Sequence, residues 1–431
     1  MSQEKAQYND TKLQKVYKEF YDENNYVREM EYSTDPLLTA IGKGEMEDYE
    51  QIVQGKYVVV PIKNGGRLGS HSKTFADAQT GSQSSDGIPD YEAFHVLLDK
   101  ETVVGRVDVQ TMKATRGKRG SYIKPLLEST NDSITTLQIK RSAQLYRDGS
   151  NQLGKVGAKS GKTITLANKW DAPLFYRGAQ IEIRDAAALG TLHQTSTVTQ
   201  INRKTGVVTF KDNIAAAVAA TDVLYYKGDY GKRCFFGLSA WLRASSADGG
   251  KNFLNVDRTV DDARLAGVKM STGSGDLRDV LIECPTEMHI QTGLRPKLDC
   301  YIMHPKMIEN LTKEMKSSYE HVRREMTDSK LGTVGYDAFK VYLNKHKPID
   351  IVESIYIDAN TIYALDKSTW LRFHYDDELV TFDSGDGLNV LRSPNDDSLE
   401  VRGYSFMGLC CPTPGKNAVI KVTSGNSAYV S

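Results

Sequence analysis

The chain has 431 residues, of which 39% are hydrophobic and 26% charged, enough for two or three domains with a large core. Lys+Arg and Asp+Glu each total 55, so the formal net charge is +0, which argues against a dedicated nucleic-acid binder with a basic excess. Mean hydropathy is -0.45, and no window approaches the roughly 20 apolar residues of a membrane span. The N-terminal residues MSQEKAQYND lack the apolar core of a signal peptide. These features predict synthesis and folding in the cytoplasm.

Residues 11–30 show a helical period that gathers apolar side chains on one face. A polar and charged segment follows, so this stripe has little nearby sequence to pack on. Two alternatives remain open: docking on a neighbouring subunit, or docking on its own domain. In the first case the candidate contacts are Leu13, Tyr17 and Phe20.

Residues 56–63 form a β-rich run that ends in the turn signal Asn64-Gly65-Gly66, and an extended pattern resumes at residues 94–98. Between them, residues 67–90 are rich in Ser, Gly, Gln and Asp. We predict a long β-hairpin with a mobile tip. Such a loop cannot support itself through hydrophobic contacts of its own, and long loops of this kind are commonly functional. The candidate inter-subunit contacts in it are Arg67, Lys73 and Phe75.

Residues 105–157 combine a short apolar run, a long helical pattern and a glycine-rich exit. Pro125 opens the helix, the pattern continues to Tyr146, and Gly149 ends it. Some 22 residues would span roughly 33 Å, as a long structural strut. A basic cluster precedes the helix and would contact phosphate or a lattice neighbour, or would be a surface cluster without a partner. Its members are Lys113, Arg116, Lys118 and Arg119.

A glycine- and lysine-rich stretch, residues 154–161, is predicted to be a linker. Beyond it, short strand patterns predict an all-β unit, either a barrel or a sandwich, with strands at 163–166, 180–183, 196–201, 207–210 and 223–226. The remaining sequence is mixed. It predicts helices at 276–292 and 305–319, and strands at 298–303, 338–343, 349–357, 361–365, 369–374 and 399–409.

No motif predicts a catalytic, cofactor or metal site. Residues 157–163 resemble a phosphate loop, but only three residues separate the glycines and a strand-like run follows. The eight histidines are scattered without helical metal spacing, and His304 is expected to cap or pack. The acidic residues 375–387 lack the calcium-loop pattern. The five cysteines fit no zinc pattern, and Cys410 and Cys411 are better read as buried thiols than as a redox or metal pair.

Three stretches carry a resemblance to a known family. They are residues 55–66 (GKYVVVPIKNGG), residues 105–157, and the series LDCYIMHPKMIENL, VYLNKHKPIDIV and TIYALDKSTWLRF. Their order resembles that of the major capsid (major head) proteins of tailed bacteriophages, which share the Hong Kong-type capsid fold. The resemblance covers nearly the whole chain and rests more on the order of the parts than on any single motif.

The resemblance implies an α+β fold in six parts. These are an N-terminal arm (1–45), an extended β-hairpin loop (46–100), a peripheral domain with a spine helix (101–154), an inserted β-barrel or sandwich (155–228), an axial domain (229–390) and a return to the peripheral domain with the C-terminal tail (391–431).

The resemblance also implies partners and a location. Hexamers and pentamers of the chain would form an icosahedral shell around packaged double-stranded DNA, held non-specifically, and the shell would expand during packaging. Scaffolding and portal proteins would assist assembly in the host cytoplasm, and the final location would be the virion. No cofactor, metal, catalytic residue or membrane is implied.

Three other functions stay open. A shell protein of a cellular, encapsulin-like nanocompartment would share the fold, although such shells are usually smaller and the inserted β unit of this chain argues against one. A phage tail or decoration protein would use the small β unit as its functional part. An enzyme would rest only on the defective glycine loop.

Overall fold

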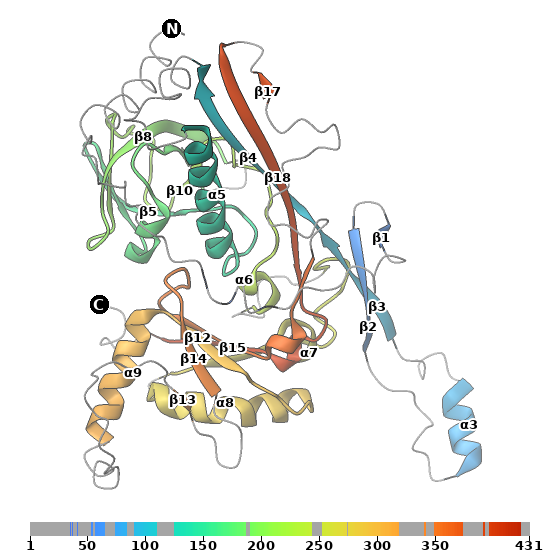
Figure 1. The fold of residues 1–431 in the computed structure, drawn as a ribbon. Helices are drawn as coiled ribbons and strands as arrows, with labels where there is room; N and C mark the ends of the chain where they lie inside the picture. The colour runs from blue at the N-terminus through green and yellow to red at the C-terminus, as the bar shows by residue number, and fades with distance from the viewer. Residues whose placement is uncertain are drawn as a thin grey trace, which may run out of the picture. The chain divides into compact units, whose positions relative to one another are not determined.

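A computed structural model gives the fold of the chain (Figure 1). It describes residues 35, 37, 41, 53–54, 57–64, 74–83, 90–109, 125–186, 190–243, 252–273, 275–318, 340–341, 349–373, 391–392 and 396–423. The chain divides into two compact units. The first comprises Met1–Thr34, Asp99–Ser142 and His374–Met407, and the second comprises Asp35–Leu98, Ala143–Phe373 and Gly408–Ser431.

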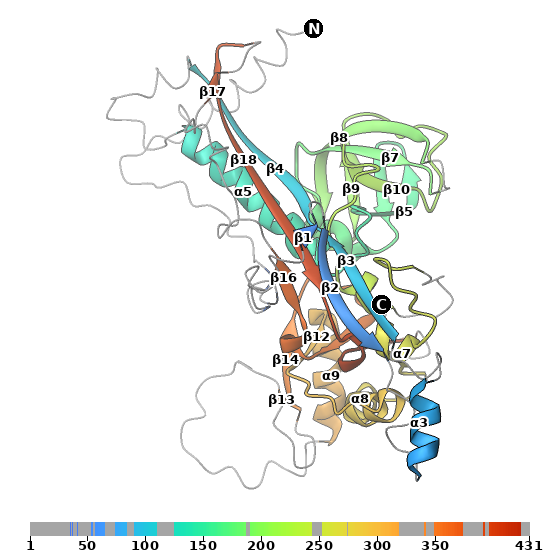
Figure 2. The ribbon, with the colours of Figure 1, turned by 90° about the vertical axis from the view of Figure 1, so that its right-hand side faces the viewer.

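The first unit is built on a long antiparallel ladder. Strand β4 (Asp99–Asp108) pairs with β18 (Ser398–Cys410) from Asp99↔Met407 to Asp108↔Ser398, and β17 (Leu391–Arg392) pairs with the other side of β18. Helix α5 (Pro125–Gln144) runs along this ladder (Figure 2). Lys140 forms a 3.0 Å ion pair with Glu101 of β4, and Ser133 donates a hydrogen bond to the Val104 carbonyl.

The predicted strut is confirmed. Helix α5 begins at the predicted Pro125 and ends at Gln144, two residues before the predicted Tyr146. Gly149 adopts a φ of +86°, a backbone conformation that favours glycine, so it turns the chain away from the helix as expected.

The second unit contains a closed barrel with strand order β10-β5-β6-β9-β8-β7. Its strands are β5 (Gly154–Ser160), β6 (Thr163–Leu166), β7 (Gln180–Arg184), β8 (Leu192–Asn202), β9 (Val207–Phe210) and β10 (Val223–Tyr226), with a 3-10 helix, η3, at Lys169–Leu174. Of the two predicted architectures, the structure therefore has the barrel. Buried Ile164, Ile181, Ile183, Val208 and Phe210 fill it.

The predicted linker at 154–161 is wrong, because residues 154–160 form strand β5. A register irregularity lies between Val156 and Ala158, and a Cβ at Gly157 would lie 3.0 Å from the Ala167 Cα. The glycine is therefore needed for a bulge with close backbone approach rather than for flexibility. Because residues 157–160 are part of this strand, residues 157–163 do not form the loop that would wrap a phosphate.

A six-stranded mixed sheet forms the second core, with strand order β11-β19-β15-β12-β14-β13. Its strands are β11 (Val268–Ser271), β12 (Cys300–Met303), β13 (Lys340–Val341), β14 (Ile349–Glu353), β15 (Thr361–Leu365) and β19 (Ala418–Lys421). Helices α8 (Leu277–Thr292) and α9 (Pro305–Ser318) bury apolar residues against alternate strand positions, including Tyr301, Met303, Ile362 and Ala364. Alternate positions share one face, so both helices cover the same face.

Both helices match their predicted positions closely. Gly293, the predicted stop of α8, has a φ of +67° and donates its backbone N–H to the His289 carbonyl. Nδ1 of His304 accepts a hydrogen bond from the Lys306 backbone N–H over 3.1 Å, so His304 caps α9 as expected. The predicted strand at 369–374 is partly wrong. A 3-10 turn at Lys367–Thr369 precedes the shorter strand β16 (Leu371–Phe373), which pairs with the end of β18.

Short elements that the sequence did not predict complete this unit: α6 (Leu238–Trp241), α7 (Asp262–Ala266) and the 3-10 turn at Pro414–Lys416. Each is at most five residues long, too short for a hydrophobic period to become visible in the sequence.

Candidate functional site

A three-stranded hairpin sheet provides the candidate site. Strand β1 (Val53–Gln54) pairs with β2 (Tyr57–Asn64), and β2 pairs along its whole length with β3 (Asp90–Leu97), from Tyr57↔Leu97 to Asn64↔Asp90. The predicted long hairpin is therefore confirmed. Because strand side chains alternate between faces, one face carries Val58, Val60, Phe94 and Val96, all of which are buried.

An aromatic cluster anchors the buried face. Phe94 meets Trp241 of α6 edge-to-face with ring centroids 5.0 Å apart, and Trp241 meets Phe253 at the same centroid distance. The His95 backbone N–H also donates to the Leu254 carbonyl over 2.9 Å. Edge-to-face aromatic pairs of this kind stabilise beyond the area they bury. These contacts thus fasten the hairpin to residues 241–254 of the same unit.

Buried Arg258 supports this anchor from behind. Its Nη1 donates to the carbonyls of Ala240 and Trp241 over 2.9 and 3.1 Å, at the end of α6, and its guanidinium lies 3.8 Å from the Phe253 ring centroid. Burial, together with nearby Arg243, lowers the pKa of Arg258 to about 10, so it stays protonated at neutral pH. The Arg258 cation lies at the carboxyl end of α6, where it supplies hydrogen-bond donors to backbone carbonyls that have no partner within the helix. These bonds hold Trp241 in place.

The opposite face of the hairpin carries three exposed large apolar side chains among the described residues. Tyr57, Tyr91 and Leu97 lie on it, and Tyr91 is 68% exposed. The Lys63 ammonium lies 5.8 Å from the Tyr91 ring centroid, and the Tyr57 and His95 rings lie 6.0 Å apart. A two-faced strand pair with one apolar face open is typical of a protein interface rather than of a free surface.

A short helix, α3 (Phe75–Gln83), lies between β2 and β3. The sequence predicted only polar loop here, so this element corrects the prediction. The Thr74 side chain caps it by accepting from the Asp77 backbone N–H, and its hydroxyl donates back to the Asp77 carboxylate. Threonine followed three residues later by an acidic residue is the signal that would have found it.

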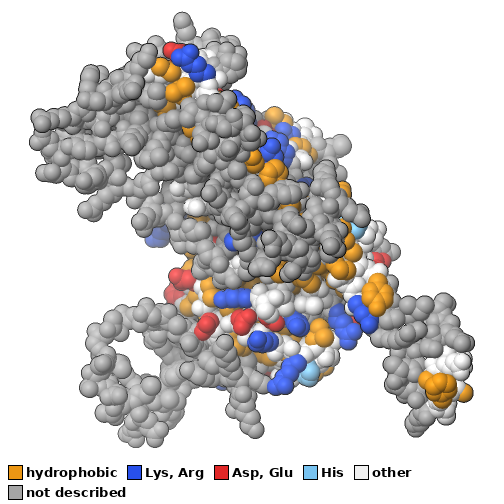
Figure 3. Space-filling view, turned by 45° about the vertical axis from the view of Figure 1, so that its right-hand side comes forward, with side chains coloured by type: hydrophobic (Ala, Val, Ile, Leu, Met, Phe, Trp, Pro, Cys, Tyr) orange, Lys and Arg blue, Asp and Glu red, His pale blue; other side chains and the backbone are white. Residues whose placement is uncertain are grey.

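Helix α3 presents a single large apolar residue. Phe75, a predicted contact, is 86% exposed at its first position, and of residues 75–80 only Ala78 is even partly buried. Hydrophobic side chains lie open beside undescribed residues on this segment, at the lower right of Figure 3. Among the described residues of this connection, Phe75 is therefore an open apolar side chain.

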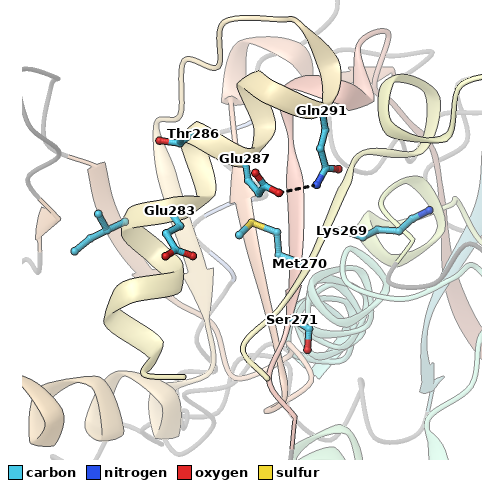
Figure 4. A pocket seen from close by; sticks show the side chains of 8 residues that line it. Lys269, Met270, Ser271, Glu283, Thr286, Glu287 and Gln291 are labelled. Atoms are coloured by element: carbon cyan, nitrogen blue, oxygen red, sulfur yellow. Dashed lines mark hydrogen bonds between the residues drawn. The ribbon is translucent and has the colours of Figure 1, made fainter. Parts of the chain in front are cut away.

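A second open surface lies between α8 and β11 (Figure 4). It is a groove of about 500 Å³ lined by Lys269, Met270, Ser271, Ile282, Glu283, Thr286, Glu287 and Gln291. Within the described sheet, β11 is an edge strand that pairs only with β19.

Comparison with solved structures places phage capsids among the neighbours of this fold. The capsid asymmetric unit of cyanophage A-1(L) matches with a TM-score of 0.48 and 12% identity, over 94% of this chain and 98% of that chain. A structure from Mycobacterium phage Che8 matches with a TM-score of 0.39 and 13% identity, over 92% and 97%. The holo-SrpI encapsulin complex of Synechococcus elongatus PCC 7942 matches with a TM-score of 0.40 and 10% identity, over 92% and 91%. No family model and no curated protein matches the sequence.

Of the predicted contact residues, only Phe75 can be placed. Leu13, Tyr17, Phe20, Arg67 and Lys73 lie outside the described residues, as do the basic residues Lys113, Arg116, Lys118 and Arg119. The sequence analysis did not name Tyr57, Tyr91 and Leu97 as candidate contacts. The signal that could have found them is their alternation along the strands with Val58, Phe94 and Val96, which separates the two faces of the hairpin.

The part of the chain that the structure describes also bears on metal binding, membrane insertion and thiol chemistry. Within it, no three His, Cys, Asp or Glu side chains are placed to hold a metal ion, and no helix is long and apolar enough to cross a membrane. All five cysteines are free and buried, and Cys410 and Cys411 are the two for which burial was predicted. Burial raises the pKa of the Cys411 thiol to about 12, so it is not a thiolate at neutral pH.

Proposed function

We propose that this chain is the major capsid subunit of a tailed double-stranded DNA bacteriophage and assembles with copies of itself into the icosahedral shell. The observation that carries the proposal is the hairpin. One face of it is anchored through Phe94 and Trp241, whereas the opposite face exposes Tyr57, Tyr91 and Leu97 and the connection exposes Phe75. An anchored, projecting apolar surface is suited to lie across another subunit. The sequence resemblance to phage major capsid proteins points to the same role.

The charge of the molecule suits dense packing. The net charge is +0, and Lys, Arg, Asp and Glu side chains are interspersed on the described surface seen in Figure 3. Interspersed charge avoids strong repulsion between neighbouring copies. Contacts between different patches on identical subunits close into rings, and rings into shells. In the proposed shell these rings are hexamers and pentamers.

The barrel has the connectivity of an insertion. The Leu153 backbone N–H donates to the Leu224 carbonyl over 2.9 Å, so the chain leaves the barrel beside the point where it begins. A unit connected in this way can be added without disturbing the surrounding fold. We assign it to the surface of the shell.

Further partners follow from the proposed role rather than from any described contact. Scaffolding and portal proteins would assist assembly in the host cytoplasm, and the shell would hold packaged DNA non-specifically in the virion. The basic residues 113–119 would contact either DNA or a neighbouring subunit.

Assembly tests the proposal. The full-length protein, purified and concentrated under assembly conditions, is expected to form closed shells or rings of five and six copies by negative-stain microscopy and light scattering. Tyr91→Glu and Phe75→Glu are expected to block assembly without unfolding the subunit, since both side chains are exposed. Leu192→Glu, on the barrel and also exposed, is the matched control and should assemble normally. A monomer under every assembly condition would contradict the proposal.

Particle content separates the two shell functions. Nuclease-protected double-stranded DNA in particles from infected cells supports the capsid. Shells filled only with protein cargo support a nanocompartment.

A further inference from the structure

The inserted barrel is the basic part of a neutral chain. Residues 155–228 contain ten Lys and Arg residues against five Asp and Glu, whereas the whole chain contains 55 of each, which leaves 45 basic and 50 acidic residues elsewhere. Within 155–228, the structure leaves only residues 187–189 undescribed, and none of these three is charged. Attraction for an anionic partner is therefore concentrated in this unit.

Three of the five acidic side chains of the barrel are engaged by basic side chains. Glu182 forms a 2.8 Å ion pair with Arg184, Asp171 forms one of the same length with Arg147, and buried Asp222 lies 2.7 Å from Nδ1 of a histidine. By contrast, six exposed basic side chains of the barrel form no ion pair among the described residues: Lys155, Lys162, Arg177, Arg203, Lys204 and Lys211. The barrel surface thus carries positive charge that the described part of the chain does not neutralise.

The turn between β8 and β9 holds two of these basic residues in place. Oδ1 of Asn202 accepts hydrogen bonds from the backbone N–H groups of Lys204 and Thr205 over 3.1 and 3.2 Å. The Gly206 backbone N–H donates to the Asn202 carbonyl over 2.9 Å, and its φ of +69° favours glycine. Arg203 and Lys204 are therefore presented by an ordered turn, so little backbone order has to be gained when a ligand binds.

Two lysines lie at the same end of the barrel as this turn. A Cβ at Gly206 would lie 2.7 Å from the Lys169 Cα. The Leu166 backbone N–H donates to the Gly206 carbonyl, and the next N–H along β6 and its exit, that of Ala167, donates to the Lys155 carbonyl, both over 2.9 Å. We call Lys155, Lys169, Arg203 and Lys204 the basic end of the barrel.

The basic end suits phosphate groups rather than aromatic or apolar ligands. Its aromatic neighbour, Trp170, is already engaged by the Lys169 ammonium, 4.9 Å from the ring centroid, and by the His304 ring, at a centroid distance of 4.5 Å. Trp170 is therefore a poor platform for stacking a nucleic-acid base. What remains is a set of cationic N–H donors, which bind phosphate oxygens through charge-assisted hydrogen bonds.

We propose that the basic end binds the phosphate groups of the anionic glycolipids and polymers that cover bacterial cells. This inference rests on the proposed function, which gives each shell many copies of the barrel at its surface. Weak phosphate contacts repeated over many copies produce strong attachment. A barrel on the outside of the shell meets the cell envelope and not the enclosed DNA. The barrel thus holds the particle at the bacterial surface.

Binding of the full-length protein to immobilised envelope polymers tests the proposal. The probes are lipopolysaccharide, whose phosphates are lipid-linked, and teichoic acid, a polyol phosphate polymer, and biolayer interferometry measures the apparent Kd. At least one probe should bind, and binding should weaken steeply with salt because phosphate contacts release counterions. The probe that binds identifies the source of the phosphate. Inorganic polyphosphate should compete, whereas neutral dextran should not. No binding to either probe, or binding that polyphosphate leaves unchanged, would overturn the proposal.

Charge reversal at the two ends of the barrel locates the site. Arg203→Glu combined with Lys204→Glu is expected to weaken binding about tenfold or more. Lys162→Glu combined with Lys211→Glu changes the charge equally at the opposite end, where the Phe210 backbone N–H donates to the Lys162 carbonyl, and should bind within about threefold of the wild type. Equal losses would show that total charge, not the basic end, determines binding.

Two further measurements separate this inference from its neighbours. The exchange Arg203→Lys with Lys204→Arg keeps both charges and should bind normally, and a loss of binding there would contradict phosphate recognition by charge. Double-stranded DNA at the same phosphate concentration is the third probe, and tighter binding to DNA than to either envelope polymer would overturn the assignment. Shells that form normally but bind no envelope polymer count against this inference alone, whereas a wild-type protein that forms no particle counts against the proposed function.

Discussion

The Tyr146 hydroxyl donates a hydrogen bond to Oδ1 of Asp35 over 3.0 Å, across 111 residues of sequence. The Leu37 backbone N–H donates to the same oxygen over 2.8 Å, and the Ser354 hydroxyl donates to Oδ2. Tyr146 also stacks on Tyr363 of the sheet, with ring centroids 6.4 Å apart. Asp35 is only 2% exposed. One carboxyl group thus joins the beginning of the second unit to the turn after α5 and to the end of β14.

We expect Asp35→Ala to lower the free energy of unfolding by about 1–3 kcal/mol, because it leaves the buried hydroxyls of Tyr146 and Ser354 without their hydrogen-bond acceptor. Chemical denaturation measures the loss. Asp35→Asn, which keeps an acceptor, is the matched control and should cost less. Equal stability of Asp35→Ala and the wild type would contradict a role for this network.

The same carboxyl predicts a pH dependence. Burial raises the pKa of Asp35, and the three hydrogen bonds only partly offset this. A raised folded pKa means that the stabilising contribution is fully present below the unfolded pKa, about 3.9, and is lost as the pH rises through the folded pKa. Relative to Asp35→Asn, the wild type should therefore gain stability on acidification toward pH 4. Denaturation of both proteins across this range checks the sign, and a constant difference would refute it.

His304 predicts the opposite pH dependence. It is 4% exposed, its ring contacts the Trp170 ring at a tilt with centroids 4.5 Å apart, and burial lowers its pKa to about 4. A depressed histidine pKa gives stability that is present above the unfolded pKa, about 6.5, and is lost as the pH falls through about 4. The wild type should lose up to about 3 kcal/mol relative to His304→Asn between pH 7 and pH 4. A ring titration near 6.5, seen by NMR, would disprove it.

Gly237 predicts a steric requirement. A Cβ at this position would lie 2.3 Å from the Gln144 carbonyl oxygen and 2.4 Å from that of Leu145, which are backbone atoms that cannot rotate away. Gly237→Ala should therefore cost about 3 kcal/mol by thermal or chemical unfolding. Gly231→Ala is the control, because Gly231 has a φ of +72° but open space around it, so strain alone should cost about 1–2 kcal/mol. Similar costs for both would refute the clash.

Two phenylalanines of the hairpin should separate folding from assembly. Phe94 is fully buried against Trp241, so Phe94→Ala should cost about 3–5 kcal/mol. Phe75 touches little in the single chain, so Phe75→Ala should change the free energy of unfolding by no more than about 0.5 kcal/mol. It should nevertheless reduce shell formation in light-scattering assays. A destabilised Phe75→Ala subunit would show that the residue serves the fold instead.

Hydrophobic period and turn chemistry alone located the elements that are locally encoded. Pro125 and Gly149 bracketed α5, Gly293 ended α8, and the strands at Thr163–Leu166 and Val207–Phe210 were placed to the residue. These signals succeed because capping, positive φ and side-chain alternation act within a few residues. The order of the parts also carried the resemblance to capsid proteins.

The tertiary structure alone decided which faces are covered. Gly154–Ser160 looked like a linker until pairing with β6 and β10 made it a barrel strand, and the all-β unit could have been a sandwich until β10 closed on β7. Likewise, only the packing of Phe94 on Trp241 shows that Tyr57, Tyr91 and Leu97 face outward, and only the position of β11 at a sheet edge opens the groove beside Ile282. Burial depends on residues far apart in sequence, so a local pattern can mark two faces of a strand or helix without telling which one meets a partner.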